Sequence, residues 1–349
     1  MSAGDFVVGL SAGFQRADGS DAFPSFDLTP LRTAAGVELQ RLSGGGRISD
    51  AQTQGLDALI LLGDAFDSAS LANNGRLKLV ARFGVGYDRV DIAACNSAGV
   101  AVSITPDGVR RPVAVAIITL MLALTGRLLD KDRLARLGGA GFARRGEFMG
   151  TGLEGKALGS VGIGNIGAEM FRLARPFGMT FLAHDPYADP QKATELGVAL
   201  IGIDELFERA DVLAVNCPLS PVTQGLVSRD RLRRMKPTAY LINTARGALV
   251  DQPALVEALQ ERWIAGAGLD VFEPEPPVIG DPILAAPNLI VTPHALSWTD
   301  QCFAAIGRSC IDAVLCARNG RAPAYLANPE LFDGQRPARL SKPGSTLAH

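Results

Sequence analysis

The chain has 349 residues, enough for two domains of roughly 100–200 residues each. Hydrophobic residues make up 47% of it, which supports a sizeable buried core, and 34 basic residues nearly balance 36 acidic ones. Without a basic excess, nucleic acid is not expected as a partner. The five cysteines show no CxxC spacing, which indicates reduced thiols in a cytoplasmic protein, with no disulfide framework and no metal site.

Residues 1–104 alternate short apolar runs with polar stretches, which predicts a small α/β domain. The N-terminus has no cationic segment followed by a long apolar segment, so we expect no signal peptide. The runs interpreted as strands are DFVVGLS, GVELQRL, LDALILLG, LKLVARFGVG and GVAVSI.

An apolar run from Val113 to Gly126 follows a predicted turn at Thr105–Gly108. The run is about five residues short of the ~18 apolar residues that suggest a membrane span. We therefore predict a buried crossover helix and no membrane partner. A helix this apolar is also expected to pack against a second copy of the chain, which predicts a homodimer through the second domain.

Residues 105–294 are predicted to form a dinucleotide-binding domain. From Ala157 onward, apolar runs alternate with amphipathic stretches, which is typical of a parallel, doubly wound sheet of six strands. A helical pattern after His294 returns the chain to the first domain, which thus comprises residues 1–104 and 295–332. Residues 333–349 are polar and rich in Pro and Gly, and we expect a loose tail. The six runs are ALGSVGI, MTFLAHD, DVLAVNC, AYLINT, AGAGLDVF and LIVTPH.

A G-x-G-x-x-G loop, with glycines 162, 164 and 167, follows the first of these six strands. The first glycine permits a tight turn, the second lets a phosphate approach the backbone, and the third allows close helix–strand packing. Asp185 ends the next strand, where a carboxylate binds the ribose 2′-hydroxyl and repels a 2′-phosphate. NAD is therefore expected in preference to NADP. The alternative is a structural turn beside a surface aspartate.

Three later strands are each followed by an ionisable residue: Arg246, Glu275 and His294. Ligands in open α/β sheets bind beyond the carboxyl ends of the strands. The three residues supply a cation for a carboxylate, a carboxylate that can orient an imidazole, and an acid/base group that works near neutral pH. Taken singly, each has a structural or solvated-loop explanation. Their occurrence together beside a nucleotide loop favours a catalytic set.

Several longer motifs resemble the D-isomer-specific 2-hydroxyacid dehydrogenase family in order and spacing. The resemblance implies two Rossmann-like or flavodoxin-like domains with doubly wound parallel sheets and the active site in the cleft between them. It also implies hydride transfer between NAD(H) and a 2-hydroxy or 2-oxo acid, as in glyoxylate or hydroxypyruvate reductases. The motifs are GKALGSVGIGNIG, HDPY, NCPLSPVTQGLV, MKPTAYLINTARGALVDQPAL, AGLDVFEPEP, PNLIVTPH, LKLVARFGVGYDRVDIAACNSAGVAV and NPELF.

The same resemblance assigns residues to roles. It implies that Arg246 binds the substrate carboxylate and polarises the 2-oxo group, and that His294 is the acid/base with Glu275 hydrogen-bonded to it. Backbone amides of Val85 and Gly86 would hold the carboxylate from the first domain. Cofactor contacts are implied for Gly162, Gly164, Asn165, Ile166, Gly167, Asp185, Cys217, Pro218, Thr223, Thr244, Ala245, Arg246, Asp270 and His294.

The chain departs from the family pattern at the start of the crossover helix. Arg110 and Arg111 stand there, and Val115 occupies the place of an expected glutamate. The arginines either are solvated or select a substrate with a second anionic or strongly polar group. Trp298, four residues past His294, either packs on the return helix or lines the substrate pocket.

Two other functions share this fold. A formate- or phosphite-type dehydrogenase uses the same Arg–Glu–His set, but needs further pocket residues that the sequence does not reveal. An NAD(H)-sensing corepressor works through protein contacts, and the intact Arg–Glu–His set disfavours it.

Overall fold

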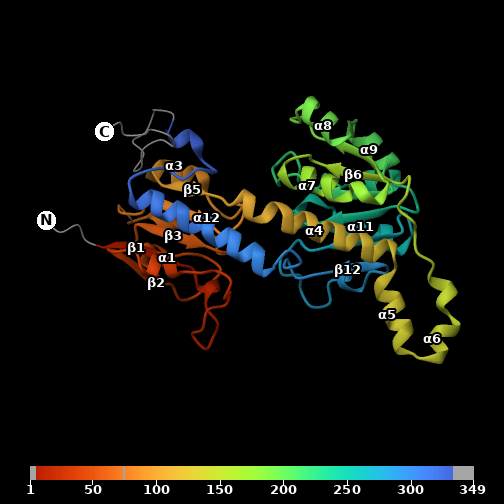
Figure 1. Cartoon of the computed structure of the whole chain (residues 1–349), viewed down its shortest axis with the longest axis horizontal. Helices are drawn as coiled ribbons and strands as arrows, with labels where there is room; N and C mark the ends of the chain where they lie inside the picture. Colours follow the sequence, from red (N-terminus) through yellow and green to blue (C-terminus); the bar gives the residue numbers. More distant parts are fainter. Residues whose placement is uncertain (1–4, 74, 333–349) are drawn as a thin grey trace. The chain divides into compact units, whose positions relative to one another are not determined.

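The computed structural model describes residues 5–73 and 75–332 of the chain, which divides into two compact α/β units (Figure 1). The first unit comprises Met1–Val109 and Trp298–His349, and the second comprises Arg110–Ser297. Both units are built on parallel sheets, which confirms the predicted fold class. The expected loose tail, residues 333–349, lies outside the described residues.

The first unit has a five-stranded parallel sheet in the order β2-β1-β3-β4-β5. This is the strand order of flavodoxin-like folds. The return helix α12 (Asp300–Arg318) packs beside β3 and β4, and α3 (Ile92–Ala98) packs on β5. The strands are β1 (Phe6–Leu10), β2 (Val37–Arg41), β3 (Ala58–Leu61), β4 (Leu79–Arg82) and β5 (Ala101–Ser103), and the short helices are α1 (Thr29–Arg32) and α2 (Asp50–Thr53).

The second unit has a seven-stranded parallel sheet in the order β12-β11-β10-β9-β6-β7-β8. The strand order reverses between β6 and β9, and dinucleotides bind at such a switch point. The strands are β6 (Ala157–Val161), β7 (Thr180–His184), β8 (Val198–Leu200), β9 (Val212–Val215), β10 (Tyr240–Asn243), β11 (Gly266–Leu269) and β12 (Leu289–Val291). The helices are α4 (Pro106–Thr125), whose first four residues belong to the first unit, α5 (Leu128–Arg136), α6 (Gly139–Ala143), α7 (Asn165–Ala174), α8 (Pro190–Leu196), α9 (Ile203–Arg209), α10 (Arg229–Arg234) and α11 (Gln252–Gln260).

Helices cover both faces of this second sheet. Successive side chains of a strand point to opposite faces. In β9, Val212 and Ala214 belong to the apolar cluster that contains Ile117 of α4. The intervening Leu213 belongs to a different cluster, which contains Leu206 of α9. Both faces are therefore buried, and ligands reach the sheet only at its strand ends.

Two local features differ from the sequence-based expectations. The strand β8 was not expected, because it is only three residues long and two of them are exposed. The turn predicted at Thr105–Gly108 is wrong, because α4 already begins at Pro106. A proline fits the first helical turn, where its missing N–H would have had no partner in the helix.

Helix α4 carries the apolar run that the sequence singled out. Among the described helices, α4 is the one that is long and apolar enough to cross a membrane. Half of its apolar stretch, however, is buried in the structure. Its Leu120 packs over Gly268 of β11, where an added Cβ would come within 3.2 Å of the leucine. A helix in a protein core can have the same length and composition. The packing of Leu120 on Gly268 makes α4 part of the core.

Candidate active site

The glycine loop joins β6 to α7 at the switch point of the second sheet. Gly162 has φ +94, and a Cβ there would lie 2.9 Å from the carbonyl oxygen of Asn216. A Cβ on Gly167 would lie 2.6 Å from the carbonyl oxygen of Gly162. No described atom lies within 4 Å of a Cβ built on Gly164. The first and third glycines thus serve backbone packing, and the second leaves the backbone open to a ligand.

The first turn of α7 adds backbone donors at this loop. Gly164 is its N-cap, and no side chain among the described residues caps the helix. The first N–H groups of a helix, here those of Asn165 and Ile166, have no acceptor within it and attract anions. Asp185 follows β7 and accepts the N–H of Ile163 at 3.0 Å. The carboxylate therefore lies beside the loop.

Residues after β9 and β10 extend the same edge of the sheet. The Thr223 hydroxyl donates to the Pro218 carbonyl at 2.7 Å. Burial raises the pKa of the Cys217 thiol to about 11, so it stays protonated. The Thr244 hydroxyl is buried and has no hydrogen-bond partner among the described residues. An open glycine, uncapped helix donors and a hydroxyl without a partner are together a chemical fit for a dinucleotide.

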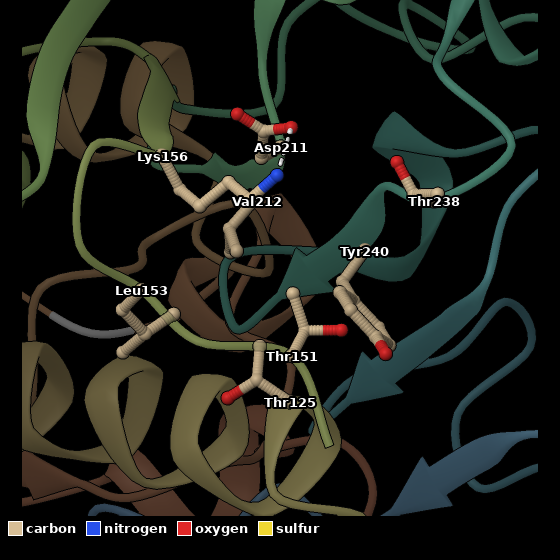
Figure 2. Close-up of a pocket in the computed structure, with 8 residues that line it drawn as sticks. All are labelled: Thr125, Thr151, Leu153, Lys156, Asp211, Val212, Thr238 and Tyr240. Carbon is tan, nitrogen blue, oxygen red and sulfur yellow. Dashed lines mark ion pairs between the residues drawn. The ribbon is translucent and has the colours of Figure 1, made fainter. Parts of the chain in front are cut away.

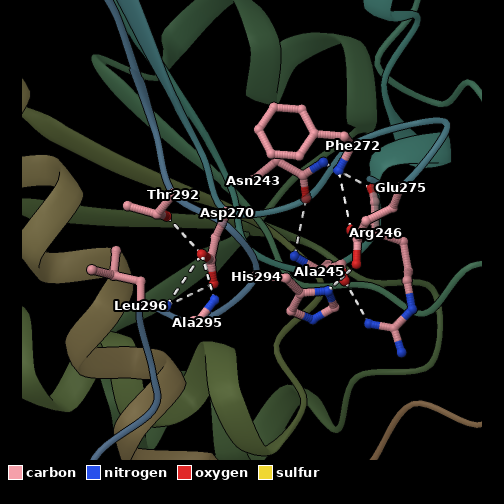
Figure 3. Close-up of polar contacts among 10 residues, drawn as sticks. All are labelled: Asn243, Ala245, Arg246, Asp270, Phe272, Glu275, Thr292, His294, Ala295 and Leu296. Carbon is pink, nitrogen blue, oxygen red and sulfur yellow. Dashed lines mark hydrogen bonds and ion pairs between the residues drawn. The ribbon is translucent and has the colours of Figure 1, made fainter. Parts of the chain in front are cut away.

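Arg246 lies on a loop after β10 that the buried Asn243 shapes (Figure 3). The Asn243 side chain donates to the Arg246 carbonyl at 2.8 Å and accepts the Ala245 N–H at 3.0 Å. A Cβ on Gly247 would lie 2.0 Å from the carbonyl group of Phe272. Only glycine lets the Arg246 loop approach the segment after β11 this closely, and that segment leads to Glu275.

Glu275 and His294 form a direct pair in the structure (Figure 3). His294 Nδ1 lies 2.6 Å from Glu275 Oε1, and Glu275 Oε2 accepts the Phe272 N–H at 3.3 Å. Burial alone would raise the pKa of Glu275, but the hydrogen bond and charge of His294 outweigh it and lower that pKa. An ionised carboxylate only accepts, so Nδ1 donates and Nε2 is left for a substrate.

Asp270 holds the segment that carries His294. Its carboxylate is buried and accepts the Thr292 hydroxyl at 2.6 Å, the Ala295 N–H at 3.1 Å and the Leu296 N–H at 3.2 Å. His294 itself has φ +54, a left-handed conformation that is uncommon for residues other than glycine. The sequence pointed to Asp270 only as a residue on the cofactor path. Its hold on backbone N–H groups leaves no signal in a single sequence.

Val85 and Gly86 lie on a loop of the first unit that hydrogen bonds hold in place. Arg82 Nε donates to the Gly86 carbonyl at 2.8 Å, and Gly84, with φ +134, exchanges hydrogen bonds with Thr105. Within residues 5–73 and 75–332, no hydrogen bond uses the N–H of Val85 or of Gly86. Both donors are available to a carboxylate.

The residues at which the chain departs from the family pattern lie in different environments. Arg111 forms an ion pair with Glu169 of α7 at 2.8 Å, which ties α4 to α7. Arg110 and Val115 are exposed. Trp298 stacks edge-on against Phe23, with ring centroids 5.5 Å apart.

A hollow at the other edge of the second sheet does not belong to this site (Figure 2). It lies at the amino ends of β6, β9 and β10, whereas the residues above follow carboxyl ends. Lys156 and Asp211 form an ion pair there at 4.0 Å. The Asp211 carboxylate is also bonded to Lys236 and to the Ala157 N–H, which gives this pair a structural role.

Known proteins are similar to this chain in sequence and in fold. Residues 118–295 match the NAD binding domain of the D-isomer specific 2-hydroxyacid dehydrogenases. A glyoxylate reductase from Korarchaeum cryptofilum is 36% identical over 80% of this chain and 85% of its own. A solved glyoxylate reductase from Paecilomyes thermophila has a TM-score of 0.79 at 27% identity, over 95% of this chain and 100% of its own. The apo D-lactate dehydrogenase from Escherichia coli has a TM-score of 0.77 at 26% identity, over 92% and 99%.

Proposed function

The chain belongs to the D-isomer-specific 2-hydroxyacid dehydrogenase family, and we propose that Arg246, Glu275 and His294 catalyse its reaction. Membership makes it an NAD-binding oxidoreductase that acts on 2-hydroxy acids. The observation that carries the residue assignment is the 2.6 Å contact between His294 Nδ1 and Glu275 Oε1, beside the loop of Arg246. A carboxylate that orients an imidazole is the usual arrangement of a general acid/base pair.

Each of the three side chains has a defined part in the reduction of a 2-oxo acid. NADH, when bound, supplies the hydride that C2 of the oxo acid receives. Arg246 binds the substrate carboxylate and stabilises the negative charge that develops on the 2-oxo oxygen. Protonated His294 donates a proton from Nε2 to that oxygen, and Glu275 stabilises the imidazolium before the transfer. In the oxidation of the hydroxy acid, neutral His294 accepts the proton.

The substrate carboxylate is proposed to bind the free N–H groups of Val85 and Gly86 as well as Arg246. This assignment takes Val85 and Gly86 from the first unit and Arg246 from the second. Two adjacent backbone N–H groups without protein acceptors can bind an anion together. Several relatives are named glyoxylate reductase, and one neighbour is a D-lactate dehydrogenase, so glyoxylate, hydroxypyruvate and pyruvate are the first substrates to assay.

NAD is proposed in preference to NADP. The support is Asp185, whose carboxylate accepts the N–H groups of Ile163 and Tyr187 at 3.0 and 2.9 Å. A carboxylate at the end of the second strand of such a fold binds the ribose 2′-hydroxyl and repels a 2′-phosphate. The other proposed cofactor contacts are Gly162, Gly164, Asn165, Ile166, Gly167, Cys217, Pro218, Thr223, Thr244, Ala245 and Asp270.

A homodimer through the second unit is also proposed. Large apolar side chains are exposed along α4, α5 and α6, and patches of this kind mark protein interfaces. The exposed side chains are Val115, Leu122, Leu128, Leu129, Leu137 and Phe142.

A cytoplasmic location is proposed as well. The five cysteines are free thiols, which supports a reducing compartment.

Substitution of the proposed acid/base and of the carboxylate-binding arginine tests the assignment. His294→Gln is expected to lower kcat for the best oxo acid by about 10²–10⁴-fold, because a general acid contributes that much. Arg246→Ala is expected to lower kcat/KM at least as strongly. The measurement is NADH consumption, with NADPH in a parallel reaction, and Arg209→Ala, on a surface pair with Glu205, is the control. Wild-type turnover in either active-site variant would refute the assignment.

A further inference from the structure

We propose that the preferred substrate is a 2-oxo acid whose side chain is aromatic or similarly bulky and apolar, received by Trp298 and Phe23. The inference rests on the proposed function and names its substrate class. It comes from an aromatic cluster in the first unit that catalysis by Arg246, Glu275 and His294 does not require.

The cluster runs from the proposed carboxylate loop to the protein surface. Phe83, directly before Gly84-Val85-Gly86, has its ring centroid 5.3 Å from that of Phe303. The ring centroid of Phe303 lies 5.2 Å from that of Trp298 and 4.3 Å from that of Phe23. Trp298 and Phe23 also contact each other edge-on. Phe83 and Phe303 thus connect the loop to Trp298 through direct ring contacts.

The rings of this cluster differ in exposure along its length. Phe83 and Phe303 are buried, and Phe23 is partly buried, whereas Trp298 is 48% exposed. The inner rings thus form ordinary core, while the outer end leaves half of an indole in solvent. An aromatic ring contributes to binding by burying its face against another ring. The outer end therefore offers a ready surface to one further apolar ring.

The position of Trp298 along the chain ties this surface to the reacting carbon. Trp298 is the fourth residue after His294, and four residue steps span at most about 14 Å. The substrate carboxylate bound at Val85 and Gly86 would sit at the inner end of the cluster. Glyoxylate has no side chain beyond C2 and would leave the indole without contact, whereas the ring of phenylpyruvate can reach it.

A second anionic group on the substrate is disfavoured by the same structure. Of the two arginines that suggested such a group, Arg111 is already paired with Glu169 at 2.8 Å. The cluster around Trp298 is made of phenylalanines 14, 23, 26, 83 and 303. Apolar rings do not compensate the desolvation of a second carboxylate.

A substrate panel with two tryptophan variants tests the proposal. The wild-type enzyme should reduce phenylpyruvate with a higher kcat/KM than glyoxylate, pyruvate or oxaloacetate. Trp298→Ala should lower kcat/KM for phenylpyruvate about tenfold, by loss of one ring contact, and change that for pyruvate less than about twofold. Trp298→Phe should retain most of the preference. The control is Trp263→Phe, because Trp263 stacks on Arg233 in the second unit.

A binding measurement covers the case in which Trp298→Ala fails to fold. The chain has two tryptophans, so Trp263→Phe leaves Trp298 as the only indole. In that variant saturated with NADH, D-phenyllactate should change the fluorescence of Trp298, and D-lactate at equal occupancy should not. NADH and a hydroxy acid cannot react with each other, so the complex is stable during the titration.

The outcomes separate this inference from the proposed function. Faster reduction of pyruvate or glyoxylate than of phenylpyruvate, with activity lost in His294→Gln, would overturn the inference and leave the function standing. Equal losses for all substrates in Trp298→Ala would also overturn it, since a purely structural tryptophan behaves so. Turnover that survives in His294→Gln would overturn the proposed roles on which the inference rests.

Discussion

Glu275 is a partly exposed carboxylate, and its contact with His294 Nδ1 leaves Nε2 as the ring nitrogen for the proposed proton transfer. The pair lowers the pKa of Glu275 against the opposing effect of burial. A lowered carboxyl pKa means that the contact stabilises the fold at pH values above the ordinary 4.5. That contribution is lost as the pH falls through the lowered pKa of Glu275.

Glu275→Gln is expected to lower kcat for reduction about tenfold or more. The carboxylate 2.6 Å from His294 Nδ1 accepts the proton of that nitrogen and orients the ring for the proposed proton transfer. The amide of glutamine keeps the size of the side chain but carries no charge and can turn its NH2 group toward Nδ1. Rates of NADH consumption measure the loss, with Glu273→Gln as a control of equal charge change. An unchanged kcat would mean that Glu275 acts only as packing.

At the residue level, the sequence could indicate the proposed catalytic residues but not the residues that hold their loops in place. Arg246, Glu275 and His294 each follow an apolar run that was interpreted as a strand. That position in the sequence was enough to predict that they lie at one edge of a sheet. Gly247 and Asp270 meet backbone groups of segments distant in the sequence, whereas Asn243 bonds the nearby Ala245 and Arg246. Which N–H an aspartate meets depends on tertiary packing, so only the structure shows that Asp270 holds residues 292–296.

At the level of elements, α7 and α9 begin in the same way but face different surroundings. Each has a glycine N-cap, Gly164 with φ −62 and Gly202 with φ −63, and no described atom lies within 4 Å of a Cβ built on either. Only the first follows β6 at the switch point of the sheet. Substitution of Gly164, with Gly202 as a matched control, therefore tests whether the open space beside Gly164 holds a ligand.

Gly164→Ala is expected to raise KM for NADH about tenfold or more, because a methyl group would keep the pyrophosphate from the backbone. Its melting temperature should stay close to that of the wild type, since the methyl group meets no protein atom. Gly202→Ala should change neither quantity. Steady-state kinetics and thermal unfolding of both variants provide the comparison. A loss of stability without a change in KM would remove the loop from the cofactor site.

The elements themselves were largely predictable because hydrophobic periodicity is a local property. All five expected strands of the first unit and all six of the second are present. The failures occurred where local signals were weak or ambiguous. β8 has one buried residue, and its pairing with β7 makes it a strand. Pro106 fits a turn or a helix start equally well, and packing of Gly108 against Ile306 accompanies the helical outcome.

At the level of the whole molecule, the segment from α4 to α6 carries exposed apolar side chains that a second copy would bury. Leu128→Glu combined with Phe142→Glu is expected to convert the proposed dimer to a monomer, because both side chains are more than half exposed. Light scattering after size-exclusion chromatography reports the mass. Leu284→Glu, at an exposed leucine of the 3-10 helix Pro282–Ala285, serves as the control. A wild-type protein that elutes as a monomer would contradict the dimer.

The bonds of Asp270 also attach His294, the proposed acid/base, to one of the two units. They attach residues 292–296 to the second unit, and the boundary between the units falls just after, at Ser297 and Trp298. The proposed proton donor, the proposed carboxylate-binding Arg246 and the glycine loop therefore all belong to the second unit. The other groups proposed to receive the substrate, Val85, Gly86, Phe23 and Trp298, belong to the first unit. With these proposed roles, evolution can alter which side chain of the acid is accepted by changing the first unit, while the second unit stays intact.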